Sequence, residues 1–105
     1  MNTQAAPSVN DEPDALRYEA HMNSELAGFI DYEWRGDRRV LVHTEVLPGF
    51  SGEGIGSALA RFAFEAALVA GRRVTVRCPF LRTYLERHPE YASISAPPRQ
   101  GPGQD

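Results

Sequence analysis

The chain has 105 residues, of which 42% are hydrophobic and 10% aromatic, a composition that predicts one small globular domain and excludes a disordered chain. Its formal net charge of −3 provides no broad basic surface, so we do not expect nucleic acid as a partner. All eleven basic residues are arginine, which excludes chemistry that depends on a lysine, such as a Schiff base or a phosphate-loop lysine.

The two ends of the chain differ in composition from its middle. Residues 1–13 are polar and contain two prolines, which predicts a flexible leader, and the proline- and glycine-rich residues 93–105 predict a disordered tail. The domain is therefore expected over residues 14–92. The start lacks the pattern of a signal peptide, no apolar run approaches about 18 residues, and the single cysteine excludes an internal disulfide. We expect a cytoplasmic protein without a membrane partner.

Three strands are predicted first, over residues 15–22, 26–34 and 39–46, from their alternation of apolar and polar residues. A turn at residues 35–37 joins the second to the third, so an antiparallel meander is the simplest arrangement. In the third strand, strict alternation places His43 and Glu45 on one face with Leu41. The same alternation places Val40, Val42, Thr44 and Val46 on the other face.

A helix is predicted from Ile55 to about residue 70, with an apolar stripe formed by Ile55, Leu59, Phe62, Ala66 and Val69. Gly71 is expected to end it, and residues 74–78 then alternate as a fourth strand that runs parallel to the third. Pro79 predicts the start of a last helix, which ends by His88. The predicted fold class is α+β, with an antiparallel meander, a βαβ crossover in a mixed sheet, and a C-terminal helix.

The stretch between the third strand and the first helix contains four glycines in eight residues, from Gly49 to Gly56. Its backbone can approach a ligand that side chains would exclude. Exposed amides followed by the positive end of a helix dipole bind phosphate groups. The sequence therefore predicts a phosphate or pyrophosphate site here.

Three separated motifs resemble the GCN5-related N-acetyltransferase family, in its minimal single-domain branch, over roughly residues 15–91. They are the glycine segment Ser51–Leu59, the pair of segments His43–Val46 and Cys78–Phe80, and His88–Tyr91 near the end. The resemblance implies acetyl-CoA as the cofactor and an N-acetyltransferase activity toward a primary amine of a small molecule or a protein. One position departs from the family, because Ser51 stands where its usual motif has Gln or Arg, and this removes a side-chain contact to the cofactor phosphates.

The resemblance also implies which residues bind the cofactor. The third and fourth strands are expected to splay apart, so that the pantetheine arm pairs with backbone near Val46. One or two of the arginines Arg72, Arg73, Arg77, Arg82 and Arg87 can bind the 3′-phosphate of the cofactor, where a fork of donors helps. The predicted cofactor-binding residues are Glu45, Val46, Ser51, Gly52, Glu53, Gly54, Ile55, Gly56 and Ser57.

Three side chains are predicted to carry the chemistry. His43 is the candidate base, because imidazole titrates near neutral pH and the strand would aim it at the reaction centre; the alternative is a solvated polar residue. Cys78, just before a helix, either accepts the acetyl group transiently, orients the substrate, or is a buried apolar residue. Tyr84 is a candidate acid for the departing thiolate or, alternatively, a core aromatic.

Two functions of different class follow from these residues. The first is an acetyl-CoA-dependent N-acetyltransferase that works by direct attack of the amine, and the second is a non-catalytic acyl-CoA-binding module, favoured by Ser51 and by a shallow site. A nucleotide enzyme is disfavoured because the loop has no lysine. The histidines and the cysteine show no metal-ligand spacing, so no metal is expected, and the short chain is expected to be a monomer.

Overall fold

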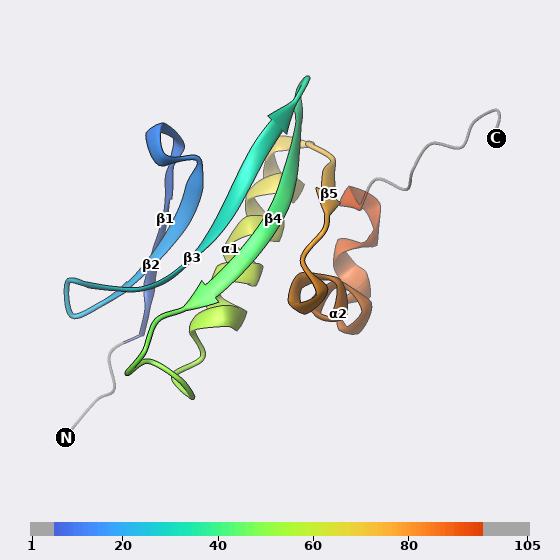
Figure 1. The fold of residues 1–105 in the computed structure, drawn as a ribbon. Coiled ribbons are helices and arrows are strands. Elements are labelled where there is room, and N and C mark those ends of the chain that lie inside the picture. The colour runs from blue at the N-terminus through green and yellow to red at the C-terminus, as the bar shows by residue number, and fades with distance from the viewer. Residues whose placement is uncertain (1–5, 96–105) are drawn as a thin grey trace, which may run out of the picture.

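The computed structural model describes residues 6–95, which form a mixed five-stranded sheet with two α-helices (Figure 1). The strands lie in the order β1-β2-β3-β4-β5; the first four are antiparallel, and β5 is parallel to β4. The predicted fold class is confirmed. In chain order the elements are β1 (Ser8–Glu12), the 3-10 helix η1 (Pro13–Ala15), β2 (Arg17–Met22), β3 (Glu25–Arg35), β4 (Arg38–Val46), α1 (Ile55–Ala70), β5 (Val74–Val76), α2 (Pro79–Arg87) and the 3-10 helix η2 (Pro89–Ile94).

Helix α1 crosses one face of the sheet and makes the core with it (Figure 1). The residues it buries are Ile55, Leu59, Ala60, Ala63, Phe64 and Ala67. This differs from the predicted stripe, since Val69 is 87% exposed. Alanine has almost no side chain, so an alanine-rich face lets the helix axis approach the sheet closely, and periodicity of large residues alone does not reveal this.

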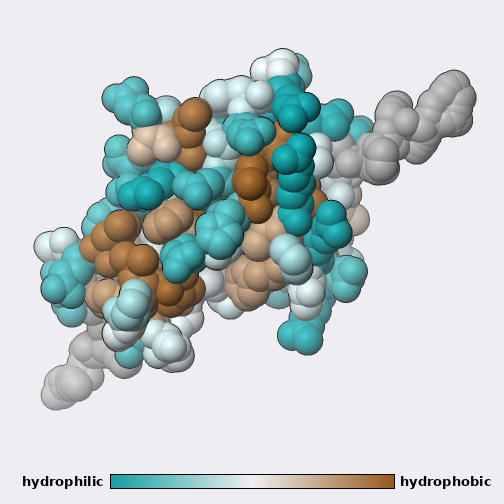
Figure 2. All heavy atoms as spheres, viewed as in Figure 1, coloured by the Kyte–Doolittle hydropathy of each residue, from teal (hydrophilic) through white to brown (hydrophobic). Residues whose placement is uncertain are grey.

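The opposite face of the sheet, which we call the open face, is not covered by either α-helix within residues 6–95 (Figure 1). Figure 2 shows this face: hydrophobic residues lie over β4 and form a larger patch at the lower left, where β4 ends near the turn between β2 and β3. A column of hydrophilic side chains lies over β5. Hydrophilic residues cover much of the rest of this face, which is why its strands alternate as half-buried strands do.

The N-terminal leader is where the structure departs most from the prediction. Residues 8–12, expected to be flexible, form β1 and pair antiparallel with β2. The backbone ladder and the contact of Val9 with the core offset the cost of ordering this polar segment. At the other end, Ser95 bridges Val74, so the domain extends beyond residue 92. The predictions for residues 1–5 and 96–105 lie outside the described residues.

A β-bulge at Val42 changes the faces of β4. Leu41 pairs with Tyr32 and His43 pairs with Asp31, which leaves Val42 without a partner in β3. Paired residues share a face, so Leu41 lies on the α1 side with the buried Tyr32, whereas His43 lies on the open face. Thr44, opposite the buried Ile30, returns to the α1 side. The strict alternation predicted for this strand is therefore wrong, although His43 and Glu45 do share a face.

Tyr91 joins η2 to α1 by a hydrogen bond, and its ionisation is expected to lower the stability of the fold at alkaline pH. Its hydroxyl donates to Glu65 at 2.7 Å, and burial, together with this hydrogen bond, raises the pKa of Tyr91 to about 12 from 10.0. A raised folded-state pKa stabilises the fold below pH 10 and loses that contribution as the pH rises through 12. We expect Tyr91→Phe to remove this part of the alkaline loss in urea unfolding between pH 9 and 12. An unchanged profile would contradict the assignment.

Candidate active site

The glycine loop ends at the N-terminus of α1, and this terminus has no side-chain cap. Gly52 and Gly54 have φ angles of 78° and 77°, a left-handed conformation that other residues rarely adopt. Gly54 is the N-cap residue, no side chain caps the helix, and its first turn contains no acidic residue. The first-turn amides therefore have no partner within the helix. These amides, and the positive end of the helix dipole, face the loop.

A cavity of about 320 Å³ opens at this helix terminus. Seven of the nine predicted cofactor-binding residues line it: Val46, Ser51, Gly52, Gly54, Ile55, Gly56 and Ser57. Glu45 and Glu53 do not line it, which suits an anion site, since a carboxylate there would repel phosphate.

Two aromatic residues of this cavity, Phe50 and Phe80, were not predicted. Phe80 is 43% exposed, and its Cζ atom would lie 3.0 Å from a Cβ atom placed on Gly56. Gly56 thus lets α2 approach the first turn of α1. The signal in the sequence was Phe80 at the start of an apolar stripe, but only the packing of the two helices shows that it reaches the loop.

A second cavity, of about 270 Å³, continues the first one along α2 and shares Ser57 and Phe80 with it. Tyr84 and Arg87 line it, so Arg87 is the cation of α2 that lies next to the loop. Tyr84 stacks on His88 with ring centroids 3.9 Å apart, and burial raises the pKa of its hydroxyl. The raised pKa favours the protonated form of Tyr84, the predicted acid, which lines this second cavity.

Strands β4 and β5 separate just before Cys78. They pair only from Arg39 to Leu41, and the amide of Arg77 then donates to the carbonyl of Leu41 at 2.9 Å. From Val42 to Val46, β4 has no strand partner on this side within residues 6–95. The splayed strands implied by the family resemblance are present.

Cys78 lies at this point, next to Thr44. It is 6% exposed, and its Sγ atom donates to Oγ1 of Thr44 at 3.4 Å. Burial alone would raise the pKa of the thiol, but the hydroxyl of Thr44 and the backbone amides at the start of α2 outweigh burial and lower it. A thiolate at this position is stabilised by the helix N-terminus.

Removal of the Thr44 hydroxyl should therefore raise the thiol pKa. We expect Thr44→Val to shift the thiolate absorbance titration of Cys78 to higher pH, while Thr44→Ser, which keeps a hydroxyl, titrates near the wild type. Equal titrations for the valine and serine variants would show that the backbone amides alone stabilise the thiolate.

His43 does not meet Cys78 in this structure. Its side chain is 55% exposed on the open face, where Nε2 lies 2.9 Å from Oε1 of Glu45. Cys78 contacts Thr44, which lies on the α1 side. The bulge at Val42 thus separates two predicted catalytic residues onto the two faces of the sheet, and they can act on a common group only at the edge of β4, where the faces meet.

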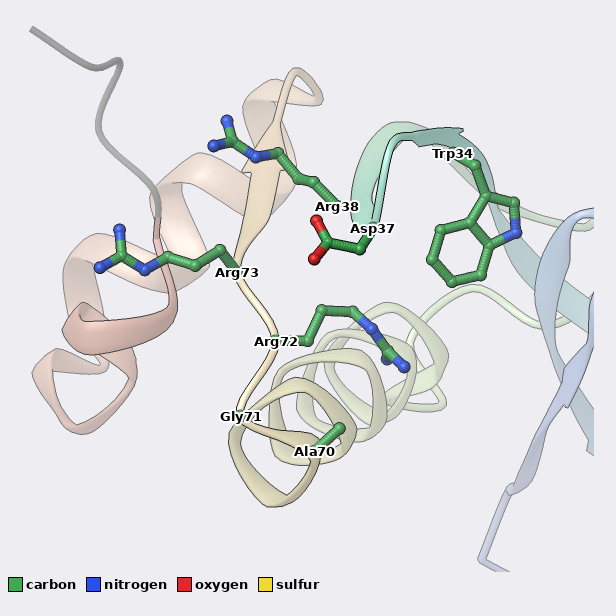
Figure 3. Close-up of a pocket in the computed structure, with 7 residues that line it drawn as sticks. All are labelled: Trp34, Asp37, Arg38, Ala70, Gly71, Arg72 and Arg73. Atoms are coloured by element: carbon green, nitrogen blue, oxygen red, sulfur yellow. The ribbon is translucent and has the colours of Figure 1, made fainter.

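A third cavity, of about 460 Å³, lies at the other end of α1 (Figure 3). It is lined by Trp34, Asp37, Arg38, Ala70, Gly71, Arg72 and Arg73. The 16 residues of α1 span about 24 Å, so Arg72 and Arg73 lie far from the glycine loop. They are poor candidates for the cofactor 3′-phosphate, and among the predicted arginines Arg87 is the better placed one.

Comparison with known proteins agrees with this geometry. A sequence profile described as GCN5-related N-acetyl-transferase matches residues 17–94. The chain belongs to the GCN5-related N-acetyltransferase family. No curated protein sequence matches it. Enzymes of this family transfer the acetyl group of acetyl-CoA to an amine, and we assign that general activity to the chain.

Solved structures of family members share the fold at low sequence identity. A GCN5-like protein from Staphylococcus aureus, determined by NMR, is 16% identical with a TM-score of 0.65, and the match covers 93% of this chain and 96% of that one. A ribosomal-protein-alanine N-acetyltransferase from Brucella melitensis is 19% identical with a TM-score of 0.54, over 79% of this chain and 62% of that one. At such identities the likeness concerns the fold alone.

Within residues 6–95, no helix is long and apolar enough to cross a membrane.

Proposed function

We propose that this chain transfers an acetyl group from acetyl-CoA to a primary amine by direct attack, with the pyrophosphate of the cofactor at the N-terminus of α1. The observation that carries the proposal is the uncapped first turn of α1, which opens onto a cavity lined by the glycine loop. Orphan amides in a first turn that contains no acidic residue suit a doubly charged anion. Arg87, in the adjoining cavity, supplies a cation that Ser51 does not.

The reacting end of the cofactor would lie along the edge of β4. From Val42 to Val46, β4 has no strand partner on the side of β5 within residues 6–95, so its backbone there can form the hydrogen bonds of a strand edge. Thr44 and Cys78 lie on the α1 side of this edge. Acetyl-CoA supplies the activated acyl group. The chain orients that group and holds the amine close to it, which accounts for much of the rate of such a reaction.

Proton transfer is assigned to His43 and Tyr84. Glu45 contacts the imidazole of His43 and orients it, so that the ring can take a proton from an amine arriving on the open face. Tyr84, which lines the adjoining cavity and whose raised pKa favours its protonated form, can return a proton to the thiolate that leaves. The carbon–nitrogen bond forms as the carbon–sulfur bond breaks.

Cys78 allows a variant of this route. Its thiolate would attack the acyl carbon, the sulfur of the cofactor would leave, and the amine would then release the acetyl group from Cys78. The lowered pKa of this thiol favours the variant, whereas its burial opposes it. Acid quench after incubation with labelled acetyl-CoA separates the routes, since only the variant leaves a label that Cys78→Ala abolishes.

Binding and transfer must be tested separately, because the alternative is an acyl-CoA-binding module without catalysis. Coenzyme A should raise the thermal midpoint of unfolding, since it binds only the folded state. Acetylation of a panel of amines, followed by mass spectrometry, should then show transfer. A thermal shift without transfer to any amine would favour the module, and no shift at millimolar coenzyme A would contradict both functions.

The role of His43 has its own readout. We expect His43→Gln to lower kcat roughly 100-fold with little change in KM for acetyl-CoA, because the substitution removes the proton acceptor and leaves the cofactor site intact. His21→Gln, the same substitution at a half-buried histidine of β2 that lines none of the cavities described above, serves as a control for general effects on the sheet. An unchanged kcat in His43→Gln would exclude it as the base.

A further inference from the structure

A cavity of about 300 Å³ on the open face borders the place where β4 and β5 separate. It is lined by Arg35, Asp37, Arg38, Val40, Thr75 and Arg77, and we call it the arginine pocket. Val40 and Thr75 are register partners whose neighbours Leu41 and Val76 face the core, so both lie on the open face. The pocket is therefore on the same face as His43.

The arginine pocket has an excess of positive charge in a chain whose net charge is −3. Three guanidinium groups and one carboxylate line it. Arg35 lies 4.0 Å from Glu33, but neither Arg38 nor Arg77 has an ion-pair partner within residues 6–95. Two guanidinium groups without a carboxylate partner are suited to bind a carboxylate or phosphate by forked hydrogen bonds.

Arg38 is directed to this pocket by a side-chain contact. Its Nη1 atom donates to Oγ1 of Thr75 at 3.2 Å. Figure 3, drawn at the larger cavity, shows the Arg38 guanidinium turned away from Arg72 and Trp34 and toward β5. Arg38 lines both cavities, and this contact directs its guanidinium to the pocket on the open face.

The pocket is adjacent to the site of transfer. Arg77 immediately precedes Cys78, and its amide forms the last link to β4 at Leu41. Along β4, His43 is three positions beyond Val40, which corresponds to about 10 Å in an extended strand and to less across the bulge. The end near His43 carries the opposite net charge, because Asp31 is its register partner and Glu45 contacts its ring. The cation on the other side of Asp31, Arg17, is paired with Glu19 at 2.8 Å.

We infer that the acetyl acceptor is an amine that also carries an anionic group, a carboxylate or a phosphate, with its amine at His43 and its anion in the arginine pocket. The inference rests on the proposed transferase function. The two ends of the site match the two charges of such an acceptor, and a diamine would place a second cation against Arg38 and Arg77. Among amines of equal length, such a site favours the one with an anionic group, because Arg38 and Arg77 repel a second positive charge.

Three acceptors of the same chain length test the charge preference: 6-aminohexanoate, hexylamine and 1,6-diaminohexane. We expect kcat/KM to fall in that order, by at least about tenfold between the first and the last. Arg77→Gln, and Arg77→Gln combined with Arg38→Gln, should bring the three values within about threefold of one another. Arg73→Gln, an exposed arginine outside the arginine pocket, should keep the wild-type order. Preference for the diamine, or an intact order in the double variant, would overturn the inference.

Binding of hexanoate gives a readout that does not depend on activity. Hexanoate has no amine, and we expect it to shift the backbone amide resonances of Thr75 and Arg77 in wild-type protein but not in the double variant. No shift in the wild type would overturn the inference. A shift with no acetylation of any of the three amines would uphold the anion pocket and contradict the transferase function, so the two failures are distinguishable.

Discussion

Ser57→Glu is expected to stabilise the fold and to weaken the binding of coenzyme A at the same time. Ser57 is the third residue of α1, in a first turn that has neither a side-chain cap nor an acidic residue. A carboxylate there would interact favourably with the helix dipole, adding about 0.3–1 kcal/mol to the free energy of unfolding. The same carboxylate would occupy the cavity and repel a pyrophosphate, so we expect the Kd for coenzyme A to rise at least about tenfold, or 1.4 kcal/mol.

Ser57→Gln is the matched control, because it has nearly the same size and no charge. Urea unfolding and titration calorimetry on the three proteins separate the two effects, and the difference between the Glu and Gln variants should diminish as salt is added. If Ser57→Glu binds coenzyme A as tightly as Ser57→Gln, the phosphates do not lie at the N-terminus of α1.

The elements around the glycine loop were predictable because their signals are local. The loop, the helix that begins at Ile55 and the proline that begins α2 depend on neighbouring residues, and the structure has each where it was predicted. The faces of β4 were not predictable, because a single unpaired residue, Val42, moves Leu41 and Thr44 to the α1 side. Bulges of this kind depend on both strands of a pair.

That bulge also determines which predicted site residues meet. Cys78 reaches Thr44, whereas His43 contacts Glu45 on the other face, so the pair His43 and Cys78 suggested by the sequence is not a contacting pair. Seven of the residues that line the cavity at the glycine loop were predicted from the sequence. This was possible because a site built from backbone amides lies in one continuous segment of the chain. The arginine pocket was missed because its residues come from β3, β4, β5 and the segments that directly follow β3 and β5.

Strand β1 was also missed because its contacts are with residues distant in sequence, and the contacts of Arg39 are an example. Arg39 is 7% exposed; its Nη1 atom donates to Asp11 at 3.1 Å and to the hydroxyl of Tyr18 at 2.6 Å. The hydroxyl of Tyr32 also donates to Asp11, at 2.6 Å. An acidic residue in a polar leader indicates flexibility from sequence alone, but here it is the counter-ion of a buried guanidinium 28 positions away.

Arg39→Ala should therefore be strongly destabilising. Its guanidinium carbon lies 4.3 Å from the ring centroids of Tyr32 and Trp34, and the substitution would remove these contacts and leave Asp11 without its cation. Loss of one partner of a buried ion pair costs about 3–5 kcal/mol, and since the side chain of Asp11 is 31% exposed we expect about 3 kcal/mol. Urea unfolding measures this loss, and amide hydrogen exchange should show the largest loss of protection in β1.

The neighbouring arginine is the natural control for that change. Arg38 is half-buried, and within residues 6–95 its side chain donates to a single group, the hydroxyl of Thr75, so Arg38→Ala should cost less than about 1 kcal/mol. Asp11→Asn keeps a hydrogen-bond acceptor for Arg39 and should fall between the two. If Arg39→Ala and Arg38→Ala destabilise equally, the contact of β1 with Arg39 contributes nothing beyond the backbone ladder. In that case β1 is held by its pairing with β2 alone, and the charge of Asp11 is irrelevant to the order of residues 8–12.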